Sequence, residues 1–191
     1  SSAMLNVLID TMPKDAGASG GKTKEEEVRE KCDELLKQLP NSFIEIEVKE
    51  ALQRAQCPRG LDPNKNIPLN IFLKQEIEQF QKILNIVRTM CSDVGAAIEG
   101  TIIMTEKLVA AISQIYDFRV PREWQFDPTG VEISWLTPSL GGWIKGLIDR
   151  HFQLFNWLTR SNSGRPQSFW LTGFYNPQGF LTAVLQEVTR M

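Results

Sequence analysis

One long run of apolar residues at helical spacing constrains the fold of this chain more than any other feature. The run begins at Leu69, and its apolar members recur on average about every 3.6 residues, the period of an α-helix. They are Phe72, Leu73, Ile77, Phe80, Leu84, Val87, Cys91, Val94 and Ile98. Gly100 is a typical C-cap, so the pattern predicts one helix of roughly 30 residues and about 45 Å. A helix of that length is typical of a strut that crosses a larger assembly.

Further helical patterns occur in the first part of the sequence. Thr23 and Glu26 have the spacing of a capping box, and an apolar helical face follows until Pro40. That face consists of Val28, Cys32, Leu35, Leu36 and Leu39. A shorter helix is expected over residues 45–56, and Thr105 is expected to cap a helix that ends near Phe118. The inward positions of these two helices are Val48, Ala51, Leu52, Leu108, Ile112 and Ile115.

The second part of the sequence is rich in aromatic residues, because all 5 tryptophans lie between Trp124 and Trp170. We expect an extended connection over residues 126–138, then a helix that starts at Thr137 and Pro138 and ends near Arg160. Its inward residues are Leu140, Trp143, Ile144, Leu147, Ile148, Phe155 and Leu158.

The last elements are a short strand at residues 168–171 and a final helix that starts at Asn176 and Pro177. The final helix is expected to face inward with Phe180, Leu181, Val184, Leu185 and Val188. The sequence therefore predicts a mainly α protein with two regions. Residues 1–124 form a helical bundle with one long helix, and residues 125–191 form an aromatic-rich helical region with at most a short strand.

The charge balance argues against several classes of partner. The sequence has 21 Lys and Arg against 23 Asp and Glu, a formal net charge of -2 at pH 7. It therefore has no broad basic field to collect phosphates, and we expect neither a nucleic acid nor a membrane as partner. The 3 cysteines have no CxxC spacing, which predicts neither a disulfide framework nor a zinc site and fits a reducing compartment.

The two ends of the sequence and its apolar runs complete this picture. Every apolar run is shorter than the roughly 20 residues that cross a bilayer, so we expect a soluble intracellular protein. Residues 1–3 are interpreted as a tag remnant. The final helical pattern stops at Met191 without a C-cap, which is typical of a piece cut from a longer protein.

A Gly-rich stretch that ends at Lys22 and Thr23 comes close to a phosphate-binding loop. It is one residue short of the pattern GxxxxGK[ST], because Ala16 stands where the first glycine belongs. Three glutamates, Glu25, Glu26 and Glu27, follow in the first turn of the next helix. Carboxylates there stabilise the helix but repel a phosphate, so the stretch favours a loop and a capped helix.

Other residues that often take part in chemistry also have ordinary structural explanations. His151 is the only histidine, so no catalytic triad or multi-histidine metal site is expected. Cys32 and Cys91 lie on apolar helix faces, where a buried thiol is expected, whereas Cys57 lies in a loop. The neighbouring carboxylates are interpreted as solvated helix faces, and they are Glu45, Glu47, Glu50, Glu76 and Glu78. The aromatic residues near Arg150, Arg160 and Arg165 are interpreted as core residues.

Several motifs in this sequence resemble dynein heavy chains. The stretch from Phe169 to Gln186 resembles the start of their C-terminal region. Further segments of the same family are matched at residues 69–77, 99–104 and 142–150, so the resemblance spans most of residues 5–191. The segment from Phe174 to Ala183, with the later Gln186-Glu187-Val188-Thr189-Arg190, is more similar to axonemal outer-arm heavy chains than to cytoplasmic ones.

The resemblance implies a fold and says where the chemistry of the family takes place. Residues 1–124 would be the helical lid of the sixth AAA+ module of the motor ring, and residues 125–191 would open the C-terminal region. In the family, ATP is bound and hydrolysed with magnesium by earlier modules, mainly the first, and the sixth has lost its nucleotide site. The resemblance therefore implies no catalytic, cofactor-binding or metal-binding residue in this sequence.

The resemblance also implies partners and a location. The function expected is that of a non-catalytic, structural and force-transmitting piece of an ATP-driven, minus-end-directed microtubule motor. Its partners would be the other AAA+ modules of the same heavy chain, and the parent would act on microtubules together with dynein intermediate and light chains. Microtubule binding belongs to a stalk outside this sequence. The expected location is the cytoskeleton of the cytoplasm, in the axoneme of a cilium or flagellum.

Two other functions stay open from the residues alone. One is a stand-alone phosphate-binding enzyme that uses Lys22 and Thr23. The other is a helical adaptor that binds a partner helix along the face from Phe72 to Ile98.

Overall fold

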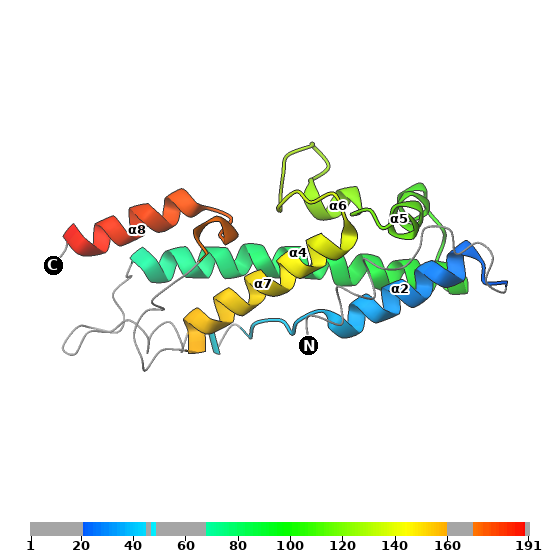
Figure 1. Ribbon diagram of the computed structural model, residues 1–191, viewed down its shortest axis with the longest axis horizontal. Coiled ribbons are helices and arrows are strands. Elements are labelled where there is room, and N and C mark those ends of the chain that lie inside the picture. Colours follow the sequence, from blue (N-terminus) through cyan, green and yellow to red (C-terminus); the bar gives the residue numbers. More distant parts are fainter. Residues whose placement is uncertain (1–20, 45–46, 49–67, 160–169, 190–191) are drawn as a thin grey trace. The chain divides into compact units, whose positions relative to one another are not determined.

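The computed structural model describes residues 21–44, 47–48, 68–159 and 170–189, and these residues are mainly α-helical. The elements in order are α2 (Lys24–Gln38), α4 (Pro68–Glu99), α5 (Glu106–Tyr116), α6 (Arg122–Gln125), α7 (Leu140–Thr159), the 3-10 helix η2 (Leu171–Gly173) and α8 (Pro177–Thr189) (Figure 1). Within the described ranges, the one β contact outside helices is an isolated antiparallel bridge between Phe126 and Glu132. The predicted mainly α fold is confirmed.

The protein forms two compact units that are interleaved along the sequence. Unit 1 comprises residues 1–40 and 83–148, and unit 2 comprises residues 41–82 and 149–191. The helices α4 and α7 each contribute residues to both units. These units are defined by internal contacts, and the predicted division of family modules at residues 124 and 125 stays a prediction. Among the described helices, none is both long and apolar enough to cross a membrane.

The helix α4 is the long helix that the apolar spacing predicts. It runs from Pro68 to Glu99 over 32 residues. It ends because Gly100 adopts a positive φ of 81°, which lets the N–H groups of Gly100 and Thr101 donate to the carbonyls of the last turn at 3.1 and 2.9 Å. The predicted C-cap is thus confirmed.

In unit 1, α2 lies antiparallel to residues 83–99 of α4. The carboxylate of Glu99 pairs with Arg29 near the start of α2, and Arg88 donates to the carbonyl of Pro40 just beyond its end. The predicted capping box is present, since the Glu26 N–H donates to the Thr23 hydroxyl at 3.2 Å and the Thr23 N–H donates to the Glu26 carboxylate at 3.1 Å.

The other face of α2 packs against α5. The predicted cap of α5 is present, because the Thr105 hydroxyl accepts the N–H of Leu108 at 3.3 Å. Lys31 of α2 donates to the carbonyl of Tyr116 at 3.2 Å, and its ammonium lies 3.9 Å from the centroid of the Phe118 ring. These contacts fix α2 to the end of α5, where Phe118 has a positive φ of 57°.

A cluster of tryptophans fills unit 1 beside α6 and the start of α7. Trp124 and Trp143 are fully buried, and their ring centroids lie 5.2 Å apart. Trp135 stacks on Trp143 at 4.6 Å, and the indole N–H of each donates to the backbone carbonyl of the other at 3.3 and 3.2 Å. This pair of hydrogen bonds attaches residues 126–138 to α7, so the interpretation of these aromatic residues as core is confirmed here.

This part of the protein differs from the prediction in two ways: it has an additional short helix, and α7 begins later than expected. The short helix α6 precedes the predicted connection, and the connection includes a turn in which the Asp127 carboxylate accepts the Thr129 and Val131 N–H groups at 2.8 and 3.0 Å. The helix α7 begins at Leu140 rather than at residues 137–138. The Ser139 hydroxyl accepts the Gly142 N–H at 3.1 Å, so Ser139 supplies the cap.

Unit 2 includes residues 68–82 of α4, residues 149–159 of α7, η2 and α8. The helix α8 runs antiparallel to α4, because its first residues lie beside Glu76 while Phe180 lies beside Phe72, one turn earlier in α4 (Figure 1). The predicted strand at residues 168–171 is wrong where the structure describes it, since Leu171 starts a 3-10 helix. Residues 168–169 lie outside the described residues, as does most of the predicted helix at 45–56, of which Glu47 and Val48 are helical.

The predicted inward faces of α7 and α8 are partly wrong. In α8, Phe180 and Ala183 are buried, whereas Leu181, Leu185 and Val188 are 47%, 64% and 58% exposed. Apolar residues occur on both sides of α8, and the attachment of its first turn to α4 decides which side faces inward. In α7, Phe155 is 48% exposed, whereas Leu154 and Leu158 are buried, so Leu154 takes the inward position predicted for Phe155.

Candidate functional site

The most unusual group in unit 2 is the buried carboxylate of Glu76. This side chain projects from α4, and the residue is only 3% exposed. One carboxylate oxygen accepts the N–H of Tyr175 at 2.7 Å, and the other accepts the N–H of Asn176 at 2.9 Å. The carboxylate therefore binds two free backbone donors where the backbone enters α8.

The residues that follow complete the start of α8. The Asn176 side chain accepts the N–H of Gly179 at 2.9 Å, which makes Asn176 the N-cap. Pro177 follows at the first helical position, where its missing N–H costs nothing. The negative charge of Glu76 also lies at the positive end of the helix dipole. Together these groups form what we call the α8 anchor, defined by Glu76, Tyr175 and Asn176.

The environment of Glu76 explains its ionisation. Burial raises the pKa of this carboxyl, and the two hydrogen bonds from Tyr175 and Asn176 lower it less than burial raises it. The interpretation of Glu76 as part of a solvated face is therefore wrong. Its neighbour Glu78 does lie on such a face, where it is exposed and 3.8 Å from Lys74. Because both Glu76 oxygens are occupied by backbone donors, the carboxylate is suited to holding structure rather than to transferring protons.

A second set of polar groups fixes the segment that leads into the anchor. Gln153 of α7 accepts the Trp170 N–H at 2.7 Å and donates to the Trp170 carbonyl at 3.1 Å. The buried guanidinium of Arg150 lies 4.5 Å from the centroid of the Trp170 ring, and burial lowers its pKa. Burial also disfavours the charged form of the Tyr175 hydroxyl. It raises the pKa of this group, so Tyr175 stays neutral.

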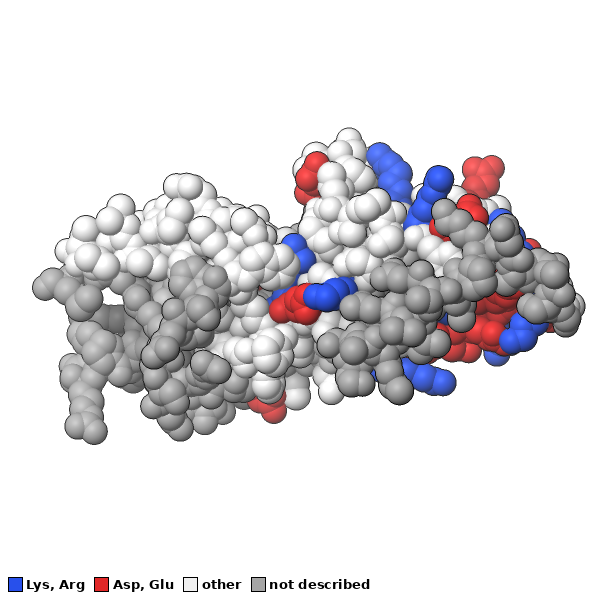
Figure 2. All heavy atoms as spheres, in the orientation of Figure 1, with Lys and Arg blue, Asp and Glu red and all other residues white. Residues whose placement is uncertain are grey.

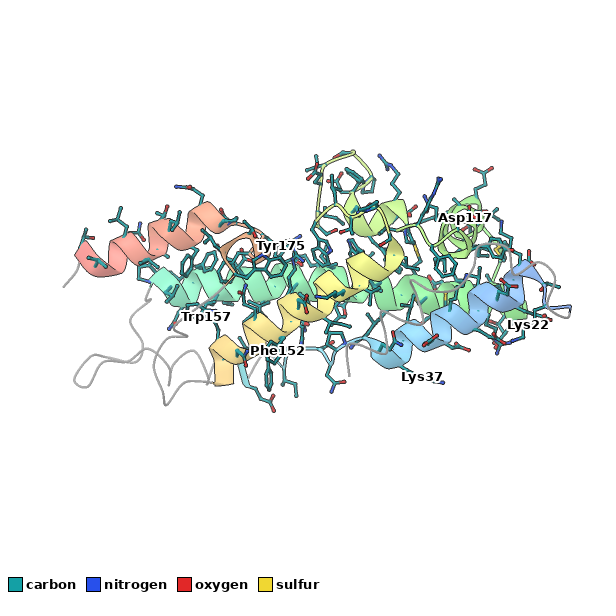
Figure 3. The ribbon with its side chains drawn as sticks, viewed as in Figure 1. Lys22, Lys37, Asp117, Phe152, Trp157 and Tyr175 are labelled. Carbon is teal, nitrogen blue, oxygen red and sulfur yellow. The ribbon has the colours of Figure 1, made fainter. Side chains whose placement is uncertain are left out.

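Aromatic rings surround the α8 anchor. The Phe174 ring lies 5.2 Å from Phe72 and 5.3 Å from Phe180, and Trp157 lies 6.0 Å from Phe180. These edge-to-face and stacked contacts place apolar rings beside the anchor, and Figure 3 labels Trp157 and Tyr175 among the side chains of this region. Trp157 and Phe174 are buried, so the interpretation as core is confirmed for these two residues. It is wrong for Phe152, Phe155 and Trp170, which are 64%, 48% and 42% exposed.

Two glycines of the segment are required by close contacts. A Cβ added at Gly173 would lie 2.4 Å from a carbon of the Trp170 ring, and a Cβ added at Gly179 would lie 2.4 Å from the Asn176 amide nitrogen. The sequence from Trp170 to Phe180 therefore combines three features: a ring held by Arg150, a tight 3-10 turn and a capped helix start.

Of the predicted phosphate-binding residues, the structure describes Lys22 and Thr23, and both side chains are engaged in other contacts. The Lys22 ammonium binds both carboxylate oxygens of Glu30 at 2.8 and 2.9 Å, and this pairing raises its pKa. The Thr23 hydroxyl is used by the capping box. Lys22 is exposed at the start of α2 (Figure 3), and Ala16 lies outside the described residues.

The remaining candidates are also placed by packing. His151 stacks on Phe43 at 4.8 Å and lies 5.7 Å from Phe80, which fits the packed histidine that the sequence favours. Cys32 and Cys91 are buried free thiols, as expected. Among the described residues, no group of three or more His, Cys, Asp and Glu side chains is placed to hold a metal ion. The candidates Glu45, Glu50, Cys57, Arg160 and Arg165 lie outside the described residues.

Sequence reasoning missed the role of Glu76, although its position gives a signal. Glu76 is four residues after Phe72 and four before Phe80, so it lies on the buried stripe of α4. A charged residue at such a position needs a buried partner. The partner itself gives no local signal, because Asn176 is 100 residues away in the sequence.

Comparison with known proteins shows which family the whole sequence is similar to. Residues 1–191 match the family described as the C-terminal domain of the dynein heavy chain. The sequence is 40% identical over 189 residues to dynein axonemal heavy chain 8 of Homo sapiens, an alignment that spans 99% of this chain. It is 39% identical over 187 residues to dynein axonemal heavy chain 5 of Mus musculus, spanning 98% of this chain, and 38% identical over 183 residues to the dynein gamma chain, flagellar outer arm, of Chlamydomonas reinhardtii, spanning 96%.

The matched region is a small part of these relatives. The present sequence spans about 4% of the length of each of the three. The predicted resemblance to dynein heavy chains is confirmed by the match over all 191 residues. The protein belongs to the family of C-terminal domains of dynein heavy chains.

Proposed function

We propose that this protein is a non-catalytic, structural and force-transmitting part of an axonemal dynein heavy chain. The whole protein would be an ATP-driven, minus-end-directed microtubule motor of cilia and flagella. The names of the relatives, axonemal heavy chains and a flagellar outer-arm chain, support the motor class and the axonemal location. Within the parent, residues 1–124 would be the lid of the sixth AAA+ module and residues 125–191 the start of the C-terminal region.

The observation that supports the non-catalytic role is the use of the polar groups in this protein. Glu76 binds two backbone N–H groups, Lys22 pairs with Glu30, and His151 is stacked between aromatic rings. Glu76 and His151 are thus engaged in packing between elements, and Lys22 is engaged in an exposed ion pair with Glu30 of the helix that it precedes. ATP and magnesium would be bound in other AAA+ modules of the same heavy chain, and no cofactor is proposed for this part.

The α8 anchor supports the force-transmitting role. It attaches α8 to the long helix α4 through a desolvated, charge-assisted contact that leaves little freedom at the attachment point. A load on one of these helices would therefore reach the other. The partners would be neighbouring modules of the heavy chain, microtubules bound through a distant stalk, and dynein intermediate and light chains.

The two alternative functions have less support. The pairing of Lys22 with Glu30 and the capping role of Thr23 leave the phosphate-binding hypothesis without its two main residues. The adaptor hypothesis needs a free face along α4, whereas Phe72, Phe80 and Val94 are already buried by the protein itself.

Titration calorimetry with magnesium-ATP and with magnesium-ADP tests the non-catalytic role. We expect no binding up to millimolar nucleotide, a binding free energy of about -4 kcal/mol or weaker. Lys22→Ala and the matched control Lys37→Ala, which changes an exposed lysine near the end of α2, should behave like the unchanged protein (Figure 3). Micromolar binding that disappears in Lys22→Ala but persists in Lys37→Ala would overturn the proposal.

A further inference from the structure

Lys31 of α2 is held against the end of α5 by aromatic rings and a carbonyl. Its ammonium lies 3.9 Å from the centroid of the Phe118 ring and 5.3 Å from the centroid of the Tyr116 ring, and it donates to the Tyr116 carbonyl at 3.2 Å. Within the described part of the chain, Lys31 makes no ion pair with a carboxylate. The residue is only partly buried, so solvent still reaches part of it.

Lys22, just before the same helix, has the opposite environment. It is exposed, and its ammonium binds both carboxylate oxygens of Glu30 at 2.8 and 2.9 Å (Figure 3). This ion pair raises the pKa of Lys22, whereas burial against the rings lowers the pKa of Lys31. The neutral amine is the nucleophilic form of lysine, so Lys31 is the better nucleophile of the two at the same pH.

Charged neighbours only partly oppose the effect of burial on Lys31. Glu27 of the same helix and Asp117, just after α5, raise the pKa of Lys31 through their charges, and Cys32 adds a smaller effect in the same direction. A second ammonium, that of Lys24, lies over the same tyrosine ring at 5.2 Å from its centroid. Burial is the largest effect, so the pKa is lowered overall.

We propose that Lys31 is an acylation site, whose ring-packed amine accepts an acetyl group from a thioester such as acetyl coenzyme A. The amine nitrogen attacks the carbonyl carbon of the thioester, so that a C–N bond forms and the C–S bond breaks. The leaving thiolate takes up the proton that the nitrogen loses. The products are an amide on Lys31 and a free thiol.

Acetylation of Lys31 weakens the attachment of α2 to α5. The acetylated side chain has no charge and therefore loses its attraction to the Tyr116 and Phe118 rings, although it keeps an N–H group. Phe118 also has a positive φ of 57°, a conformation that depends on the contacts around it. The melting temperature of the protein is therefore expected to fall by roughly 5 °C on acetylation.

Site-resolved mass spectrometry tests the site in the full 191-residue protein. The folded protein is incubated with acetyl coenzyme A at several pH values, and the acetylated fraction of each lysine is followed over time. We expect Lys31 to react roughly fivefold faster than Lys22 near neutral pH, because a larger fraction of its amine is neutral. The ratio should shrink as the pH rises, because Lys31 becomes fully neutral first.

The same reaction in urea is the control for the role of the fold. Unfolding removes both the rings around Lys31 and the ion pair of Lys22, so the two lysines should then react at similar rates. A rate for Lys31 equal to or below that of Lys22 in the folded protein would overturn the proposal. An excess of Lys31 acetylation that persists unchanged in urea would also overturn it, since the fold would not be its cause.

Thermal unfolding of three variants tests the consequence of the lost charge. Lys31→Gln imitates the acetylated side chain and should lower the melting temperature by roughly 5 °C, whereas Lys31→Arg keeps a cation over the rings and should change it much less. Lys37→Gln removes an exposed charge from the same helix and should have little effect. Equal melting temperatures of Lys31→Gln and Lys37→Gln would show that acetylation does not loosen α2, contrary to the proposal.

Discussion

At the scale of single residues, two opposing effects set the pKa of the Glu76 carboxyl. Burial disfavours its negative charge, while the N–H groups of Tyr175 and Asn176 favour it. The raised pKa means that burial is the larger effect. The residue is nevertheless well suited to its position, because the two backbone N–H groups would otherwise be buried without an acceptor. A carboxylate has an oxygen for each donor.

The first prediction concerns the replacement Glu76→Gln. A glutamine has one acceptor oxygen, and its NH₂ group would face the second backbone N–H. We expect the free energy of unfolding at neutral pH to fall by about 2 kcal/mol, the cost of one unsatisfied buried donor. Urea unfolding measures it, with Glu78→Gln as the control, since Glu78 is exposed on the same helix. Equal stabilities of the two variants would contradict the assigned role.

The second prediction concerns pH. The pKa of Glu76 is raised above its ordinary value of 4.5, so the folded protein holds this proton more tightly than the unfolded protein. The contribution of Glu76 to stability is therefore greatest below pH 4.5 and is lost as the pH rises through the raised pKa. Glutamine does not titrate, so Glu76→Gln should cost more at about pH 4 than at about pH 8. A cost that grows with pH would mean that the pKa is lowered instead.

At the scale of elements, α4 and its end have two glycines with opposite roles. Gly95 lies inside the helix, and a Cβ added there meets nothing within 4 Å. Gly100 lies after the last turn with a φ of 81°, a conformation that disfavours other residues. The same substitution should therefore have opposite effects at these two nearby positions.

The third prediction uses this contrast. Gly95→Ala should raise the free energy of unfolding by about 0.5–1 kcal/mol, because alanine loses less backbone entropy in a helix. Gly100→Ala should lower it by about 1 kcal/mol, because alanine is strained at a left-handed C-cap. Thermal unfolding of the two variants beside the unchanged protein measures both signs. A decrease for Gly95→Ala would mean that α4 requires this glycine for another reason.

Most helices of the described residues follow from local sequence signals. The periodicity from Leu69 to Ile98, the capping box at Thr23 and the cap at Thr105 each act within a few residues, so the sequence predicts α2, α4 and α5 well. The inward face of α8 cannot be predicted in this way. Apolar residues lie on both of its sides, and Glu76 of another helix selects the side with Phe180.

The candidate site is harder to predict than the helices for the same reason. The α8 anchor joins residues that are far apart in the sequence, and no local pattern specifies such pairs. The motif from Phe174 to Phe180 identifies the family without revealing its own physical role. Its Asn176, Gly179 and Phe180 are the cap, the close contact and the buried ring.

At the scale of the whole molecule, the protein corresponds to a small part of its relatives. It spans about 4% of proteins that are named as axonemal and flagellar dynein heavy chains. In α8, Leu181, Leu185 and Val188 are apolar and exposed, and the described residues of this helix are white on the face that Figure 2 shows. A helix with such a surface is held in place by its first turn, so the α8 anchor is the contact whose loss should matter most in the parent.

The last prediction is made for a complete heavy chain that includes this sequence. If α8 and α4 transmit force through the anchor, Glu76→Gln should slow microtubule gliding by roughly fivefold, a coupling of about 1 kcal/mol. ATP turnover without microtubules should stay unchanged, since the nucleotide sites are proposed to lie in other modules. Glu78→Gln removes the same charge two residues away and should glide normally. Equal gliding speeds of the two variants, with the anchor shown by hydrogen exchange to be weakened only in Glu76→Gln, would contradict a role of the anchor in force transmission.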